Sequence, residues 1–141
     1  RYVTVKVHEN SRKVFGLERW TNKEPTYLVE GPIDSLFLPN SLAMAGADMS
    51  DLSFLNKINT TLIFDNEPRN DHISKRMVDA LEKGWKIVVW QDQGNKWDSR
   101  APKDINDMVI SGKTTDEILK IINKNTYSGQ RGKWEVTYWK V

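Results

Sequence analysis

The sequence predicts an α/β fold in which a mostly parallel sheet carries helices on both faces. Three observations support this prediction. Short apolar runs without alternation, such as residues 61–64, are typical of strands that are buried on both faces. Segments with helical spacing of apolar residues lie between these runs, and glycine or proline marks the joints. Strands that alternate with helices in this way form βαβ units with right-handed crossovers.

The first twenty residues predict an antiparallel hairpin ahead of the sheet. Residues 2–7 alternate β-formers with polar residues, a turn-like segment follows at residues 9–11, and residues 14–20 form a second candidate strand. We expect one domain, because a chain of 141 residues fits a single core. Within it we expect the hairpin at residues 1–24, a core at residues 25–124 and a C-terminal extension at residues 125–141.

Residues 27–29 form the first apolar run of the core and end at Glu30, Gly31 and Pro32. Glycine permits a tight turn and proline suits the first position of a helix, so we expect a short helix over residues 33–38. Pro39 ends this helix, and residues 42–45 form a second small strand. We expect residues 54–58 to form a helical crossover.

The strand predicted at residues 61–64 leads through an acidic segment into the best-defined helix. Apolar residues between positions 73 and 81 repeat at helical spacing, and Gly84 ends the helix. Residues 86–90 predict a fourth buried strand, and a polar loop then leads to a helix from about Asp104 to Ile110. Residues 114–117 supply a capping box for another helix, and the alternation over residues 134–141 predicts a last strand.

Composition and charge exclude several classes of protein. The net charge of +2 permits contact with phosphates but is below the strongly basic footprint of a dedicated nucleic-acid binder. No apolar stretch approaches the ~20 residues of a membrane span, so we expect no membrane insertion. The absence of cysteine excludes disulfides and cysteine-based zinc sites, and the cytoplasm fits by default. The start at Arg1 indicates a domain of a longer protein.

Carboxylates follow two of the four predicted core strands, with Glu30 after one and Asp65 and Glu67 after another. In open parallel sheets, substrates bind at the carboxyl edge of the strands. Pro68 disfavours the α conformation at Glu67, which keeps this pair of acids out of the following helix. Converging carboxylates need a counter-charge, which a hard cation such as Mg²⁺ supplies. The sequence therefore predicts a metal site at this edge, and Asp34 is placed to orient Glu30 or to share a second ion.

Three segments resemble the Toprim family in their order and strand context: residues 27–36 (YLVEGPIDSL), 63–67 (IFDNE) and 103–107 (KDIND). Toprim domains occur in primases, topoisomerases and OLD-type nucleases, and they carry Glu-Gly after the first strand and an acid-x-acid pair after a later one. Glu67 departs from the commoner aspartate. Residues 30–40, 65–70 and 125–129 are similar to bacteriophage primases in particular, and the resemblance extends from about Tyr27 to Gly129.

The resemblance implies a Toprim-like, Rossmann-like fold and a DNA primase that makes RNA primers in phage replication by nucleotidyl transfer with Mg²⁺ or Mn²⁺. Glu30 would act at the reacting centre, as general base or orienting ligand, and Asp65 and Glu67 would hold the ion. Asp34 and Asp104 would complete the acidic patch. The expected catalytic residues are therefore Glu30, Asp34, Asp65 and Glu67, and the expected metal ligands are Glu30, Asp65, Glu67 and Asp104.

The resemblance also implies partners: a single-stranded DNA template, nucleoside triphosphates, a replicative helicase and a zinc-binding module outside this cysteine-free chain. The expected location is the cytoplasm of an infected bacterial host. Lys103, Arg69 and Arg100 flank the acidic loops and are candidates for binding nucleotide phosphates or template. Trp97, in the polar loop, is the candidate for stacking on bases, whereas burial explains most of the other tryptophans.

Simpler explanations and other functions stay open at this point. Any single carboxylate fits a solvated surface group, and a basic residue beside acids is often a charge-balancing neighbour. Asp104 also fits the N-cap of the helix that follows it. A Toprim-type nuclease would use the same acids for strand cleavage. In a receiver domain Asp65 would accept a phosphoryl group and Lys103 would sense it, although Glu30 followed by Gly31 does not fit that family.

Overall fold

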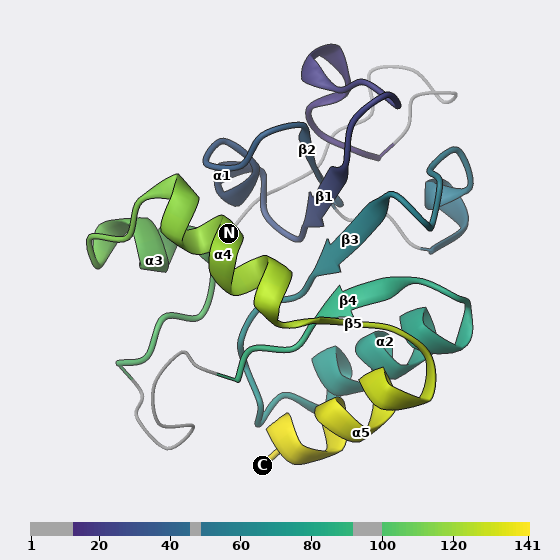
Figure 1. Cartoon of the computed structure of the whole chain (residues 1–141), viewed down its shortest axis with the longest axis vertical. Coiled ribbons are helices and arrows are strands. Elements are labelled where there is room, and N and C mark those ends of the chain that lie inside the picture. The colour runs from purple at the N-terminus through teal and green to yellow at the C-terminus, as the bar shows by residue number, and fades with distance from the viewer. Residues whose placement is uncertain (1–12, 46–48, 92–99) are drawn as a thin grey trace.

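The computed structural model describes residues 13–45, 49–91 and 100–141 (Figure 1). Within these residues the chain forms a five-stranded sheet in the order β2-β1-β3-β4-β5. The first four of these strands are parallel to one another, and β5 is antiparallel to β4. This arrangement confirms the predicted α/β class. The strands are β1 (Thr26–Val29), β2 (Ser41–Ala43), β3 (Thr60–Ile63), β4 (Lys86–Val88) and β5 (Thr126–Tyr127).

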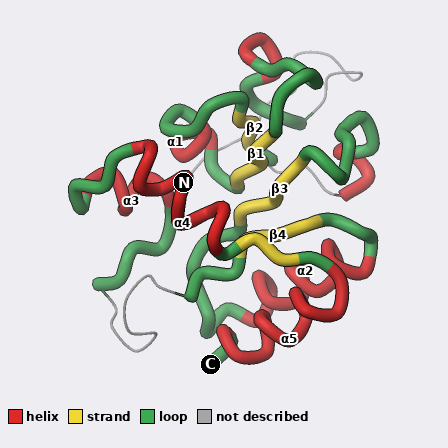
Figure 2. Tube along the Cα trace, viewed as in Figure 1, coloured by secondary structure: helices red, strands yellow, loops and turns green. Residues whose placement is uncertain are grey.

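Helices cover both faces of the sheet, as predicted. Figure 2 shows α1, α3 and α4 on one side of the strands and α2 with α5 on the other. The strand order explains this division, because β2 and β4 lie on opposite sides of the β1–β3 pair and right-handed crossovers then place α1 and α2 on opposite faces. The helices are α1 (Pro32–Ser35), α2 (Asp71–Glu82), α3 (Ile105–Ile110), α4 (Thr115–Lys124) and α5 (Gly129–Trp139), with short 3₁₀ turns at η1 (Leu17–Arg19) and η2 (Met49–Leu52).

Two of the predicted helices are confirmed, and each begins with a side-chain cap. Asn70 accepts a hydrogen bond from the backbone of His72 at the start of α2. Thr114 and Glu117 form the predicted capping box of α4. The core lies between the helices and the sheet, where Leu28, Leu62 and Ile87 have no exposed surface. All four residues of β3 are buried, as expected for a central parallel strand.

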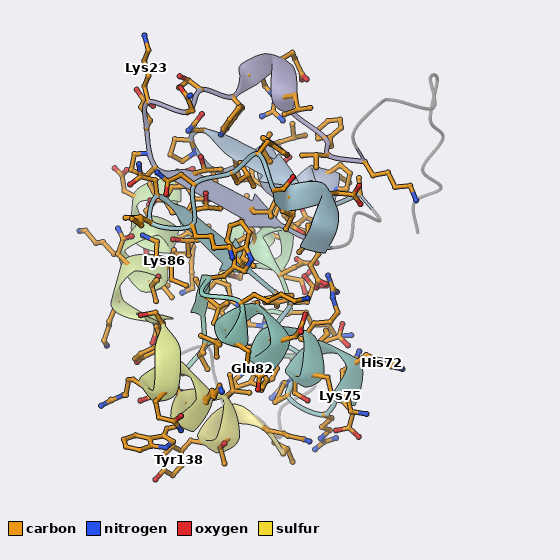
Figure 3. All side chains as sticks on the ribbon, turned by 90° about the vertical axis from the view of Figure 1, so that its right-hand side faces the viewer. Lys23, His72, Lys75, Glu82, Lys86 and Tyr138 are labelled. Atoms are coloured by element: carbon orange, nitrogen blue, oxygen red, sulfur yellow. The ribbon has the colours of Figure 1, made fainter. Side chains whose placement is uncertain are left out.

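The prediction of a strand at residues 134–141 is wrong, because residues 134–139 form the last part of α5 and Lys140 is its C-cap. An alternating strand would place Trp134 and Tyr138 on its apolar face, but these residues are 58% and 72% exposed. Figure 3 shows Tyr138 at the outer surface of the molecule. The buried positions are Gly132, Val136 and Trp139, which have helical spacing. The two-residue strand β5 was not predicted, since two residues are too few to show a period.

Other boundaries also differ from the prediction. Residues 14–20 contribute one antiparallel bridge, from Phe15 to Ala43, before Gly16 turns the chain at φ 101° into η1. The helix expected at residues 33–38 ends at Ser35, whose hydroxyl donates to the carbonyl of Pro32. Residues 54–58 form turns, and a 3₁₀ turn precedes them instead of a helical crossover. The first strand of the predicted hairpin lies outside the described residues.

Candidate metal centre

The carboxyl ends of β1 and β3 bring the first two acidic segments together. Val29 pairs with Ile63 in register, so Glu30 and the residues after β3 leave the sheet side by side. The backbone N–H of Asp65 donates a hydrogen bond to Glu30 Oε2 at 3.0 Å. The predicted convergence of Glu30 and Asp65 at this edge is therefore present in the fold.

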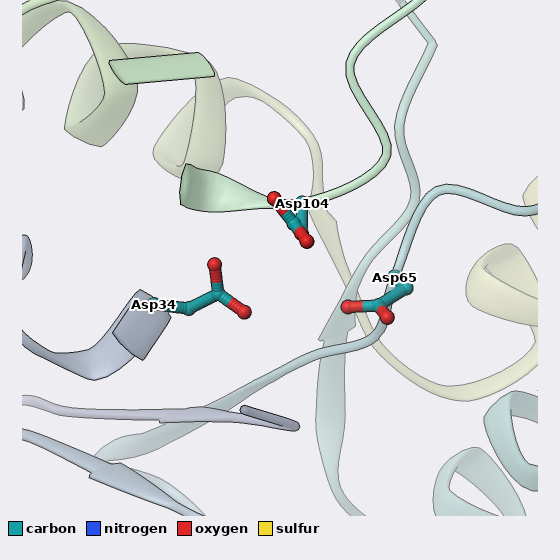
Figure 4. A group of neighbouring side chains, drawn as sticks. All are labelled: Asp34, Asp65 and Asp104. Carbon is teal, nitrogen blue, oxygen red and sulfur yellow. The ribbon is translucent and has the colours of Figure 1, made fainter. Parts of the chain in front are cut away.

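Three aspartates meet at this edge (Figure 4). Asp34 lies in α1, Asp65 follows β3, and Asp104 caps the N-terminus of α3. One carboxylate oxygen from each of the three lies within 4.8 Å of the others. Carboxylate oxygens at such spacing are the ligands that Mg²⁺ and Mn²⁺ take in proteins.

The cluster carries more negative charge than its surroundings balance. Burial, followed by the charges of Glu30 and Asp34, raises the pKa of Asp65 to about 8. Burial also raises the pKa of Asp34 to about 6, although the backbone N–H of Asn106 donates to this carboxylate at 2.8 Å and opposes the shift. The pKa of Asp104 is raised as well, again chiefly by burial. A divalent cation would supply the missing positive charge, so the donor set fits such an ion.

The aspartates open onto a pocket of about 320 Å³. Its wall is mostly polar and includes the start of α1 and the start of α3. This volume leaves room for a phosphate group beside the three carboxylates. The lining residues are Glu30, Gly31, Ile33, Asp34, Asp65, Asp104 and Asn106.

Asn66 joins three segments behind this pocket. Its backbone N–H donates to the carbonyl of Lys103 at 2.5 Å, and its side-chain amide donates to the carbonyl of Pro102 at 3.3 Å. Its side-chain oxygen accepts from the indole N–H of Trp139, at the end of α5, at 2.9 Å. Val141 adds a backbone hydrogen bond to the carbonyl of Pro68 at 3.0 Å. These bonds fix the loop that carries Asp65 against both the segment before Asp104 and the C-terminal helix.

Four predicted site residues that the structure describes are not part of the pocket wall: Glu67, Lys103, Arg69 and Arg100. Glu67 is absent from the lining and accepts a hydrogen bond from the side chain of Asn70 at 3.2 Å, although its charge acts on Asp65. The candidate basic residues Lys103, Arg69 and Arg100 are all exposed. Trp97 lies outside the described residues.

Arg76 belongs to the site but was not predicted. The helical pattern placed it on an outer face of α2, whereas its guanidinium forms an ion pair with Glu30. The partner lies 46 residues away in sequence, so no local signal could have identified the pair. Asn106 was not predicted either, since it acts through its backbone N–H.

An α/β sheet with acids converging at its carboxyl edge is typical of metal-dependent enzymes that act on phosphates. No protein-family model matches the chain. The chain is similar to the DNA primase of Enterobacteria phage T4, with 32% identity over 139 residues, which is 97% of this chain. The chain spans 39% of the length of that protein. This similarity relates the chain to part of a DNA primase.

None of the described helices combines the length and the hydrophobicity that a membrane span requires.

Proposed function

We propose that this chain is the Toprim-type catalytic domain of a phage DNA primase, which joins ribonucleotides on a single-stranded DNA template. The convergence of Asp34, Asp65 and Asp104 at the carboxyl edge carries this proposal. The similarity to the T4 DNA primase supports the choice of reaction among those that such an acidic pocket could perform.

In this proposal Asp34, Asp65 and Asp104 hold Mg²⁺ or Mn²⁺. When bound, the ion supplies positive charge to phosphoryl oxygens and stabilises their transition state. Glu30 lines the same pocket and bonds to the backbone of Asp65, which places it to orient this ligand. Glu67 adds negative charge from outside the lining.

The exposed basic residues would bind the substrates. Lys103 directly precedes Asp104, and Arg69 and Arg100 lie in the two loops that lead away from and toward the pocket. We assign these three side chains to nucleotide phosphates or template, which attract cations through their charge. A replicative helicase and a zinc-binding module are the further partners that this function implies.

Primer synthesis by the chain itself tests the proposal. The chain is incubated with Mn²⁺ or Mg²⁺, ribonucleoside triphosphates and single-stranded DNA, and labelled DNA without nucleotides is incubated in parallel. We expect RNA oligonucleotides from the parent chain and none from Asp65→Asn. Cleavage of the DNA without synthesis would contradict a primase and favour the nuclease. A stable phosphoryl group on Asp65 after treatment with acetyl phosphate would favour the receiver domain.

A further inference from the structure

Glu30 differs from the three aspartates in how its carboxylate is held. Its Oε1 forms the ion pair with Arg76, and its Oε2 accepts the backbone N–H of Asp65 at 3.0 Å. Both oxygens therefore have protein partners, although the side chain is still 18% exposed. No comparable ion pair with a basic side chain is found for Asp34, Asp65 or Asp104 among the described residues.

Arg76 is itself held from several sides. The centre of its guanidinium lies 5.2 Å from the centroid of the Phe64 ring, and Nη2 lies 3.6 Å from Sδ of Met44. Phe64 directly precedes Asp65, and Met44 directly follows β2. Arg76 therefore contacts the ends of three neighbouring strands, which fixes a guanidinium beside the acidic pocket.

This arrangement opposes coordination of an ion by Glu30. A divalent cation at the Glu30 carboxylate would have to displace a charge-assisted hydrogen bond and approach the positive guanidinium. Within the described part of the chain, the carboxylates of Asp34, Asp65 and Asp104 form no ion pair that a cation would have to displace. The geometry thus separates the four carboxylates of the pocket into three candidate ligands and one paired neighbour.

We propose that Arg76 is a positioning residue that holds Glu30 against the backbone of Asp65, so that Glu30 orients this aspartate and does not coordinate the ion. The inference rests on the metal site of the proposed function. It differs from the sequence-based expectation that Glu30 is itself a ligand. It also assigns a role to a side chain outside the Toprim-like motifs.

Mn²⁺ titration calorimetry on the 141-residue chain tests this role. Arg76→Met keeps an unbranched side chain over Phe64 and removes the charge. We expect it to tighten Mn²⁺ binding about tenfold, because the released Glu30 gains access to the ion and a nearby positive charge is lost. The same variant should lose primer synthesis. Tighter binding with lower activity is a combination that simple loss of structure would not produce.

The double variant Glu30→Gln with Arg76→Met removes the pair without changing the net charge. If Glu30 is not a ligand, we expect the double variant to bind Mn²⁺ within about threefold of the parent, because the glutamine side-chain oxygen can still accept the backbone N–H of Asp65. A loss of more than about 100-fold, beyond the range of supporting contacts, would show that Glu30 coordinates the ion and would overturn the inference. Arg76→Lys keeps the charge, and we expect it to bind Mn²⁺ as the parent does.

Lys75→Ala is the matched control, because it removes one positive charge from the neighbouring position of α2. Lys75 lies on the outer surface (Figure 3) and lines a groove between α2 and α5. We expect it to change Mn²⁺ affinity by less than about twofold, since its charge is solvated. If Lys75→Ala tightened Mn²⁺ binding as much as Arg76→Met does, long-range charge alone would explain the Arg76 effect. This result would contradict the inference.

The same titrations distinguish failure of the inference from failure of the metal site. Absence of Mn²⁺ binding in the parent chain would overturn both. If the parent chain binds Mn²⁺ and both Asp65→Asn and the double variant lose this binding, the metal site stands and only the positioning role is overturned. Circular dichroism on each variant verifies that it is folded.

Discussion

The acidic pocket and the α2–α5 surface contain similar side chains in different electrostatic settings. On the α2–α5 surface, acids pair with bases: Lys140 lies 3.1 Å from Asp71, and Lys133 lies 3.4 Å from Glu82. The pKa of Asp71 is accordingly lowered, first by its hydrogen bond to Lys140. In the pocket, burial and neighbouring acids raise the pKa of Asp65 instead. Burial together with local charge balance therefore distinguishes the candidate site from the ordinary surface.

Loss of one pocket carboxylate should have the largest effect on this contrast. We expect Asp65→Asn to weaken Mn²⁺ binding at least about 100-fold, because it removes one of the three proposed ligands, and supporting contacts alone are typically worth about 10–100-fold. Titration calorimetry measures the change. Asp71→Asn is the matched control, and equal losses in both variants would erase the distinction between the two regions.

The pH dependence of metal-free stability should show the same contrast. The folded-state pKa of Asp65, about 8, lies above its ordinary value of 3.8, and the pKa of Asp34 is raised to about 6. Between the unfolded and folded pKa values of these aspartates, the folded chain binds more protons than the unfolded chain. The free energy of unfolding should therefore fall as pH rises from about 4 to about 8.

Urea denaturation in EDTA at pH 5 and pH 8 measures this trend. Asp65→Asn should flatten it and should be at least as stable as the parent at pH 8, since the substitution relieves repulsion within the cluster. A free energy of unfolding that rises over this pH range would contradict the raised pKa values of Asp65 and Asp34.

Packing at the other region should respond to a change that leaves the pocket chemically intact. A Cβ added at Gly132 would lie 2.5 Å from Cδ2 of Leu81, so Gly132→Ala should push α5 away from α2. We expect a loss of about 1–3 kcal/mol in the free energy of unfolding by urea. Gln130→Ala, at an exposed position of the same helix, serves as the control. Equal stability of both variants would contradict close packing of the two helices.

The smallest effect is expected from a solvated ion pair on α2. Lys83 and Asp79 lie 2.8 Å apart at helical spacing, and each side chain is about half exposed. Lys83→Ala should change the free energy of unfolding by only about 0.3–0.5 kcal/mol. Thermal unfolding at low and high salt measures it. A change larger than that of Gly132→Ala would mean that surface pairing contributes more to this region than packing does.

Local signals explain which parts of the fold and site the sequence could predict. The apolar run before Glu30, the turn at Gly31 and Pro32, and the capping box at Thr114 act over a few residues and all have their expected consequences in the structure. The meeting of Glu30 and Asp65 followed from the general rule that parallel strands share a carboxyl edge. These features required no knowledge of tertiary contacts.

The errors share a different origin, because each depends on contacts between distant segments. Alternation over residues 134–141 looked like a strand, but α5 packs against α2, where Gly132 approaches Leu81, and it buries Val136 and Trp139 at helical spacing. The pairing of Arg76 with Glu30, which was not predicted, depends in the same way on how α2 packs on the sheet. A periodic pattern carries no information about such partners.

The bonds from Trp139 and Val141 to the loop that carries Asp65 have a consequence for the order in which the molecule is made. A chain emerging from the ribosome presents β1 and β3 long before these residues are available. The loop can receive its last two anchors only after the stretch that ends at Val141 has been translated. Protection of the Trp139 indole N–H and the Val141 backbone N–H from hydrogen exchange should therefore arise late, after the sheet itself is complete.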